Sequence, residues 1–124
     1  MLAAGYGYWR HTPAAPPAPE ALWHNGVIVE VRNCELPASE EIQVRCAAMI
    51  CAQRVTAQLT NPQQTNVKLT RYQRDARSGL IQVAGTLEQY LASPTLPTGF
   101  TCATADPQQA RPVLQYAALP RPQP

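Results

Sequence analysis

The spacing of hydrophobic positions along the chain changes from strand-like to helical and back to strand-like. Residues 27–32 form a β-branched run typical of a strand, and Asn25-Gly26 in front of them is a turn signal. Residues 40–59 carry apolar side chains at helical spacing, whereas residues 67–73 and 80–87 alternate with a period of two. The pattern therefore predicts one strand, one long helix and then a group of strands.

The predicted helix has clear boundaries. Ser39 supplies an N-cap hydroxyl, and the two acidic residues after it complement the helix dipole. Asn61-Pro62 ends the helix, because a residue before proline is disfavoured in the helical region. Gln43, Arg54 and Gln58 fall on the polar side. The face expected to be buried comprises Val44, Ala48, Cys51, Ala52, Val55 and Leu59.

The later strands are expected to form an antiparallel meander. Residues 67–73 and 80–87 flank a five-residue, glycine-containing turn, which is typical of a hairpin. Residues 83–91 are then expected to pair with residues 100–104. The predicted fold class is α+β: a small single domain of order β-α-β-β-β, with one long helix on an antiparallel sheet and disulfide staples.

Composition divides the chain into three parts. Residues 1–21 are interpreted as a leader followed by a Pro/Ala-rich tether, residues 22–105 as the α+β domain, and residues 106–124 as a Pro/Gln-rich tail. Residues 1–10 resemble the last turns of an apolar helix followed by interfacial aromatic residues. Two interpretations stay open: the end of a truncated membrane anchor, and a short disordered leader.

The four cysteines predict two disulfide bonds. Cys46 and Cys51 leave the predicted helix about 140° apart, so they cannot pair with each other. Cys51 lies on the core-facing stripe, and we predict a bond to Cys102. Cys34 is then left for Cys46. The linker between Cys34 and the start of the helix spans about 17 Å, which is enough to reach Cys46. Cys51 lies about 18 Å along the helix axis, at or beyond the limit of this linker. Free buried thiols are the alternative, and disulfides favour an oxidising compartment.

Charge and hydropathy give few functional leads. Ten basic and eight acidic residues leave a net charge of +2, too small to indicate a nucleic-acid partner. No run of consecutive apolar residues is long enough to span a membrane. The frequent use of Ala, Pro and Gln, and of Arg over Lys, is associated with GC-rich bacterial or phage genomes.

Candidate chemistry is sparse, and no catalytic, cofactor-binding or metal-ligating residue is assigned. His11 and His24 do not complete a zinc ligand set with the cysteines, and no Cys-x-x-Cys motif is present. Ser39, Ser78 and Ser93 lie in cap or turn contexts without a nucleophile motif. No cofactor is expected.

Two surfaces remain as candidates for binding. Ile42, Met49 and Ile50 lie on a second apolar strip of the helix, which would be a partner surface if the domain covers it only in part. The second candidate is a basic patch on the hairpin at residues 68–77, composed of Lys68, Arg71, Arg74 and Arg77.

The basic patch is expected to be divided by the pleat of the strand. Strict alternation places Lys68 and Arg74 on one face with Tyr72, and Arg71 on the other face with Leu69. A solvated edge, where lysine and arginine oppose aggregation, is the structural alternative to a site for phosphate or acidic lipid.

The resulting functional hypothesis is a non-enzymatic extracytoplasmic protein-interaction module, either envelope-tethered or secreted. Its expected partner is another envelope or secreted protein, with the membrane involved only through a missing N-terminal anchor. Nucleic acid and small-molecule substrates are not expected. The alternatives are a thiol/disulfide-active accessory domain of an enzyme complex, and an anion or nucleic-acid binder that uses the basic hairpin.

Overall fold

The structure is a computed structural model that describes residues 17–35, 39–89 and 96–116. The anchor or leader expected at the N-terminus, and part of the tether, lie outside the described residues. Among the described helices, none has the length and apolar character needed to cross a membrane.

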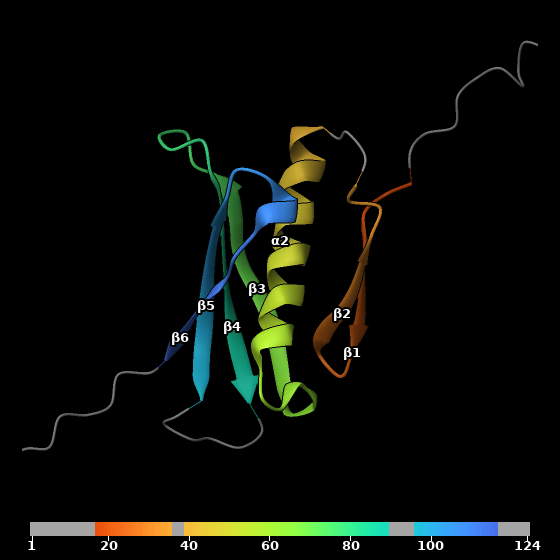
Figure 1. The fold of residues 1–124 in the computed structure, drawn as a ribbon, viewed down its shortest axis with the longest axis vertical. Coiled ribbons are helices and arrows are strands. Elements are labelled where there is room, and N and C mark those ends of the chain that lie inside the picture. The colour runs from red at the N-terminus through yellow and green to blue at the C-terminus, as the bar shows by residue number, and fades with distance from the viewer. Residues whose placement is uncertain (1–16, 36–38, 90–95, 117–124) are drawn as a thin grey trace, which may run out of the picture.

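One long helix and two antiparallel sheets make up the fold, which confirms the α+β class (Figure 1). A two-stranded sheet has the order β1-β2, and a four-stranded sheet has the order β3-β4-β5-β6. The elements are β1 (Glu20–His24), β2 (Val27–Arg32), α2 (Glu40–Gln58), η1 (Pro62–Gln64), β3 (Thr65–Arg74), β4 (Ile81–Gln89), β5 (Pro97–Thr104), η2 (Pro107–Gln109) and β6 (Val113–Tyr116).

The expected helix and meander are confirmed. Helix α2 begins at Glu40, and Ser39 is its N-cap: the N-H of Ile42 donates to Ser39 Oγ at 3.4 Å. Strand β3 pairs antiparallel with β4, and β4 pairs antiparallel with β5. The order β-α-β-β-β was incomplete, however, because it lacked β1 and β6 at the two ends of the domain. Strand β1 lies partly, and strand β6 wholly, outside residues 22–105, the range expected for the domain.

Strand β1 pairs with β2 through a tight turn at Asn25 and Gly26. Both residues have positive φ, 50° and 79°, as a type I′ hairpin turn requires. A side chain on Gly26 would also collide with Asn66, which closes the space beside the turn. The same turn is fastened to the larger sheet, because the Val67 N-H donates to the Gly26 carbonyl at 2.7 Å.

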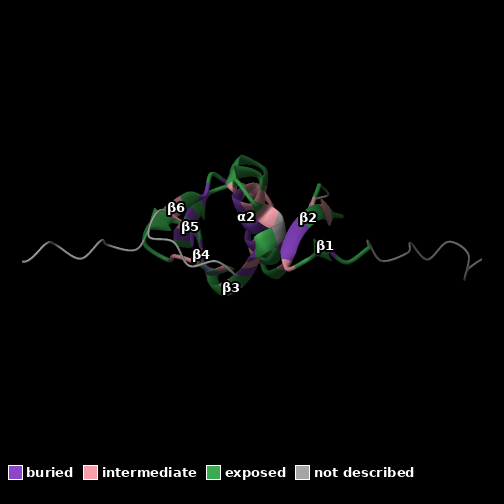
Figure 2. Ribbon diagram, turned by 90° about the horizontal axis from the view of Figure 1, so that it is seen from below, coloured by how far each residue is buried: buried purple, intermediate pink, exposed green. Residues whose placement is uncertain are grey.

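The strands form an arc around helix α2. In Figure 2, the β1–β2 hairpin lies on one side of the helix, β5 and β6 lie on the other, and β3 lies between them. The helix contacts β2, β3, β4, β5 and η2. It is therefore covered on more than one side, whereas the opposite face of the four-stranded sheet has no second layer among the described residues.

Burial along the helix agrees with this arrangement. Ala48, Cys51, Ala52 and Val55 are buried as expected, whereas Val44 and Leu59 are only half-buried at the edge of the core. Cys46, Ala47 and Ile50 are buried as well, on the second side of the helix. Gln43 and Arg54 are half-buried and Gln58 is exposed, so none of these three polar residues belongs to the core.

The predicted disulfide pairing is confirmed. Cys34 bonds to Cys46 and fastens the end of the β1–β2 hairpin to one side of the helix. Cys51 bonds to Cys102 and fastens the helix to strand β5. The two bonds leave no free cysteine and join the helix to both sheets.

We expect loss of the Cys51–Cys102 bond to destabilise the domain more than loss of the Cys34–Cys46 bond. The sequence separations are 51 and 12 residues, which correspond to about 4 and about 3 kcal/mol of chain entropy. Guanidinium unfolding of Cys51→Ala/Cys102→Ala and of Cys34→Ala/Cys46→Ala measures the difference. An equal or larger loss in the second variant would contradict the prediction.

Gly85 marks a close approach between strand β4 and its neighbours. A Cβ at this position would lie 2.3 Å from Phe100 Cε1 and 2.7 Å from the Lys68 carbonyl oxygen. We therefore expect Gly85→Ala to lower the free energy of unfolding by about 1–3 kcal/mol, because buried Phe100 must move. Thr86→Ala on the exposed face is the control and should change it by less than about 0.5 kcal/mol.

Candidate functional site

The outer face of the four-stranded sheet is the candidate site. On this face a single row of paired residues crosses the sheet, in the order Arg71, Ala84, Thr101 and Val113. Arg71 and Thr101 are exposed, Ala84 is half-buried, and Val113 is 63% exposed. The row thus has an arginine at one end, an exposed valine at the other end and small side chains in between.

A bulge in strand β3 gathers basic residues on this face. The register shifts between Leu69 and Arg71, so Thr70 is the extra residue. Lys68 then pairs with Thr86 and Arg71 pairs with Ala84, both on the outer face. The predicted division by strict alternation was therefore wrong, because one inserted residue reverses the alternation beyond it.

Because of the same bulge, Tyr72 and Arg74 at the end of strand β3 lie on the face of the sheet that packs on the helix. Tyr72 pairs with buried Val83, and Arg74 pairs with buried Ile81, so both point to the inner side. Arg74 Nε donates to Glu40 Oε1 at 2.5 Å, and Nη1 donates to the Gly79 carbonyl at 2.6 Å. Arg74 is thus bound to the helix and the turn, and it does not belong to the basic surface.

This ion pair changes the ionisation of both partners. The hydrogen bond from Arg74 lowers the pKa of the Glu40 carboxyl, and the attraction between the charges adds to that effect. The same hydrogen bond raises the pKa of the Arg74 guanidinium. The pair therefore stabilises the contact between the start of helix α2 and the end of strand β3 at neutral pH.

The two remaining members of the predicted patch lie in different surroundings. Arg77 is exposed in the β3–β4 turn, where the Asp75 carboxylate accepts from the Ser78 hydroxyl at 2.8 Å. Lys68 lies diagonally across from Glu88, because Thr86, its pairing partner, is two residues from that carboxylate. Of the four predicted residues, Arg71 alone lies on the open face away from a carboxylate.

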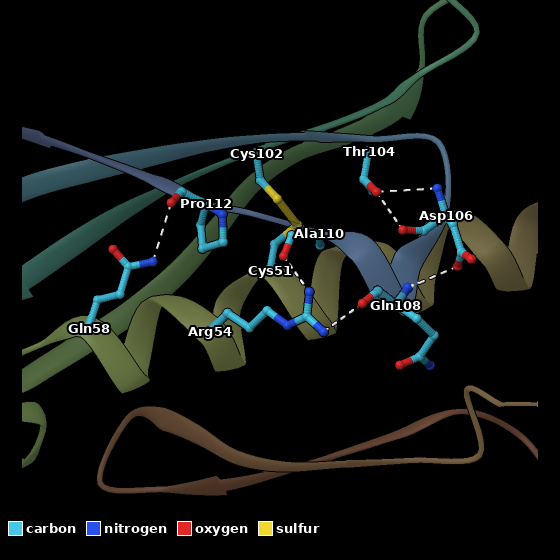
Figure 3. The surroundings of a disulfide bond; sticks show 9 residues. All are labelled: Cys51, Arg54, Gln58, Cys102, Thr104, Asp106, Gln108, Ala110 and Pro112. Atoms are coloured by element: carbon cyan, nitrogen blue, oxygen red, sulfur yellow. Dashed lines mark hydrogen bonds between the residues drawn. A yellow bond between two sulfur atoms is a disulfide. The ribbon is translucent and has the colours of Figure 1, made fainter.

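A further arginine, Arg111, joins Arg71 at this face. The segment before strand β6 is bound to the helix through its backbone, as Figure 3 shows. Arg54 donates to the carbonyls of Gln108 and Ala110, and Gln58 donates to the carbonyl of Pro112 at 3.3 Å. Ala110 and Pro112 are therefore buried, and Arg111 between them is exposed.

Arg71 and Arg111 line the same shallow hollow. Its volume is about 540 Å³, and its lining also includes Ala84, Thr101 and Ala103. Neither arginine forms a hydrogen bond or an ion pair with any described residue, whereas Arg32, Arg45 and Arg74 each have a carboxylate partner. The hollow thus combines small side chains, the Gln82 amide and Val113 with two guanidinium groups that have no partner among the described residues.

The helix strip proposed as a partner surface is only partly accessible. Ile50 is 5% exposed and belongs to the core, so it does not contribute to an accessible surface. It lies one turn after Cys46, on the side that the bond to Cys34 fastens to the hairpin. Ile42 and Met49 are half-buried and remain a smaller candidate surface.

The cysteines and acidic residues form no metal-ligand cluster in the described part of the chain. No group of three His, Cys, Asp or Glu residues is arranged there to hold a metal ion. Cys46, Cys51 and Cys102 are buried within their disulfides, and Cys34 is half-buried.

Comparison with known proteins finds no matching family model, no matching curated protein and no matching solved structure. The candidate site therefore stands on the geometry of this chain.

We expect the Glu40–Arg74 pair to contribute stability that is lost in acid. Because the pKa of Glu40 is lowered in the folded state, this contribution is present above the ordinary value of 4.5 and falls as pH drops through the folded-state pKa. The wild-type chain should therefore be more stable than Glu40→Gln at pH 6, and the difference should shrink toward pH 2. Unfolding free energies measured across this range provide the test.

The matched control is Glu41→Gln in the same helical turn. Its carboxylate lies 3.9 Å from Arg45 Nη2 and both side chains are exposed, so its replacement should change stability less at every pH. A pH-independent difference between the wild-type chain and Glu40→Gln would contradict the prediction.

Proposed function

We propose that this domain is a non-enzymatic protein-interaction module that works outside the cytoplasm and binds its partner through the outer face of the four-stranded sheet. The observation that carries this proposal is the pair of unpaired arginines, Arg71 and Arg111, at a hollow on a sheet face that no described element covers. Charged groups without internal partners are available for an intermolecular contact, where they favour encounter and select the partner.

The disulfides support the proposed compartment. Two intramolecular disulfide bonds are typical of an oxidising, extracytoplasmic environment. Within that environment, the proposal is a periplasmic or secreted domain of bacterial or phage origin. The Pro/Ala-rich residues 13–19 would act as a semi-rigid tether that holds it away from a membrane or an assembly.

The two alternative functions have weaker support. A thiol/disulfide-active domain needs an accessible disulfide, but Cys51 and Cys102 are buried between helix and sheet and only Cys34 is partly accessible. A nucleic-acid binder needs a denser array of cations than Lys68, Arg71 and Arg111 provide.

Site-specific photo-crosslinking in cells that produce the full chain tests the proposal. A benzoylphenylalanine at Ala103, which is exposed in the hollow, should give a discrete adduct with one protein of the same compartment. The same residue at Val29, which is 51% exposed on the hairpin, is the matched control and should give none.

A third position, Met49, examines the half-buried helix strip. Adducts from Met49 alone would move the interface to the helix and contradict the proposed face. Absence of adducts from all three positions would contradict a protein-binding function for this domain.

A further inference from the structure

We infer that the outer face of the sheet binds an acidic segment of the partner protein, whose carboxylates pair with Arg71 and Arg111 across the hollow. This inference rests on the proposed function and deepens it, because it gives the chemistry of the partner. Guanidinium groups bind carboxylates through two parallel hydrogen bonds, which fix geometry as well as charge.

The dimensions of the face fit such a segment. Arg71 and Val113 lie three strand spacings apart, which is about 14 Å at about 4.8 Å for each spacing. Arg111 lies two residues before Val113 and lines the same hollow. An extended peptide repeats its side chains on one face about every 7 Å, so carboxylates two or four residues apart lie within reach of both arginines.

The floor of the hollow allows a backbone to approach closely. Ala84 and Ala103 carry only a methyl group, and Thr101, which pairs with Ala84, adds a hydroxyl. Gln82, paired with Ala103 and exposed, offers an amide for hydrogen bonding to a peptide group. Ala84 and Thr101, the two central residues of the row, both have shorter side chains than arginine.

The charge of the face selects an acidic occupant. The described carboxylate on the outer face of strand β4 is Glu88, at the end nearer Lys68 and four residues from Ala84. Asp75 in the hairpin turn is occupied by hydrogen bonds from Ser78. An acidic segment would thus neutralise two cations that have no partner among residues 17–35, 39–89 and 96–116, without meeting a carboxylate in the lining of the hollow.

A nucleic-acid strand fits this face less well than an acidic peptide. Binding of single strands combines a row of cations with aromatic side chains on which bases stack. The aromatic residue of the hairpin, Tyr72, lies on the other side of the sheet because of the bulge at Thr70. We therefore treat oligonucleotide binding as an outcome of the test that would overturn the inference.

An NMR titration of the oxidised full-length chain tests the inference. The probe is acetylated, amidated pentaglutamate, and pentaglutamine is the matched control peptide. Pentaglutamate should shift the backbone amides of Ala84, Thr101 and Ala103. The shifts should weaken at 0.5 M salt, because the Debye length there is roughly 4 Å, against about 30 Å at 0.01 M. Pentaglutamine should leave these amides unchanged.

Variants then assign the effect to the two arginines. Arg71→Gln/Arg111→Gln should weaken pentaglutamate binding by about tenfold or more, whereas Arg77→Gln, which removes an exposed arginine from the turn, should change it by less than about twofold. Thr101→Glu should also abolish binding, because it adds a carboxylate to the floor. Thermal melts confirm that these surface variants remain folded.

Three results would overturn the inference: equal shifts with both peptides, binding that survives loss of both arginines, and tighter binding of a ten-nucleotide single-stranded DNA at the same amides. A crosslink from Ala103 without a response to pentaglutamate would reject the acidic ligand and leave the protein-binding function intact. Pentaglutamate binding without a crosslink would reject the protein-binding function and not the chemistry of the site.

Discussion

Helix α2 is apolar around most of its middle, and this one constraint shapes the rest of the domain. A single sheet covers only one side of a helix, so residues such as Cys46 and Ile50 need a second cover. The β1–β2 hairpin supplies it, and the Cys34–Cys46 bond holds it there. The hairpin and the segment at η2 both pack on the helix, so the covering elements that the structure describes lie on the inner side of the four-stranded sheet.

The open outer face is the counterpart of that arrangement. Antiparallel sheets commonly bury one face and leave the other in water, and here the solvent face carries small and polar residues beside two arginines. The inner side, by contrast, satisfies its charges: Arg74 is paired with Glu40, and Arg54 is bonded to backbone carbonyls. The outer face thus carries two arginines, Arg71 and Arg111, that have no partner among the described residues.

Much of the fold could be predicted from the sequence, because strong local signals determine it. The helix follows from its cap and apolar spacing, and the disulfide pairing follows from the angle between Cys46 and Cys51. Apolar and polar residues alternate only weakly along strand β1. Asn25-Gly26 is nevertheless a type I′ hairpin signal, and it predicts a strand on each side of the turn. The bulge at Thr70 and the role of Arg111 have no comparable signal, since both depend on pairing between distant segments.

Arg54 and Gln58 hold the segment before strand β6 to the helix by donating hydrogen bonds to its main-chain carbonyls. Such bonds specify where the backbone runs and place no demand on which exposed side chain it displays. Position 111 can therefore change its chemistry while the scaffold beneath it stays fixed. A domain built in this way separates stability from selectivity, so that evolution or an engineer can retune what the surface recognises by exchanging single residues there.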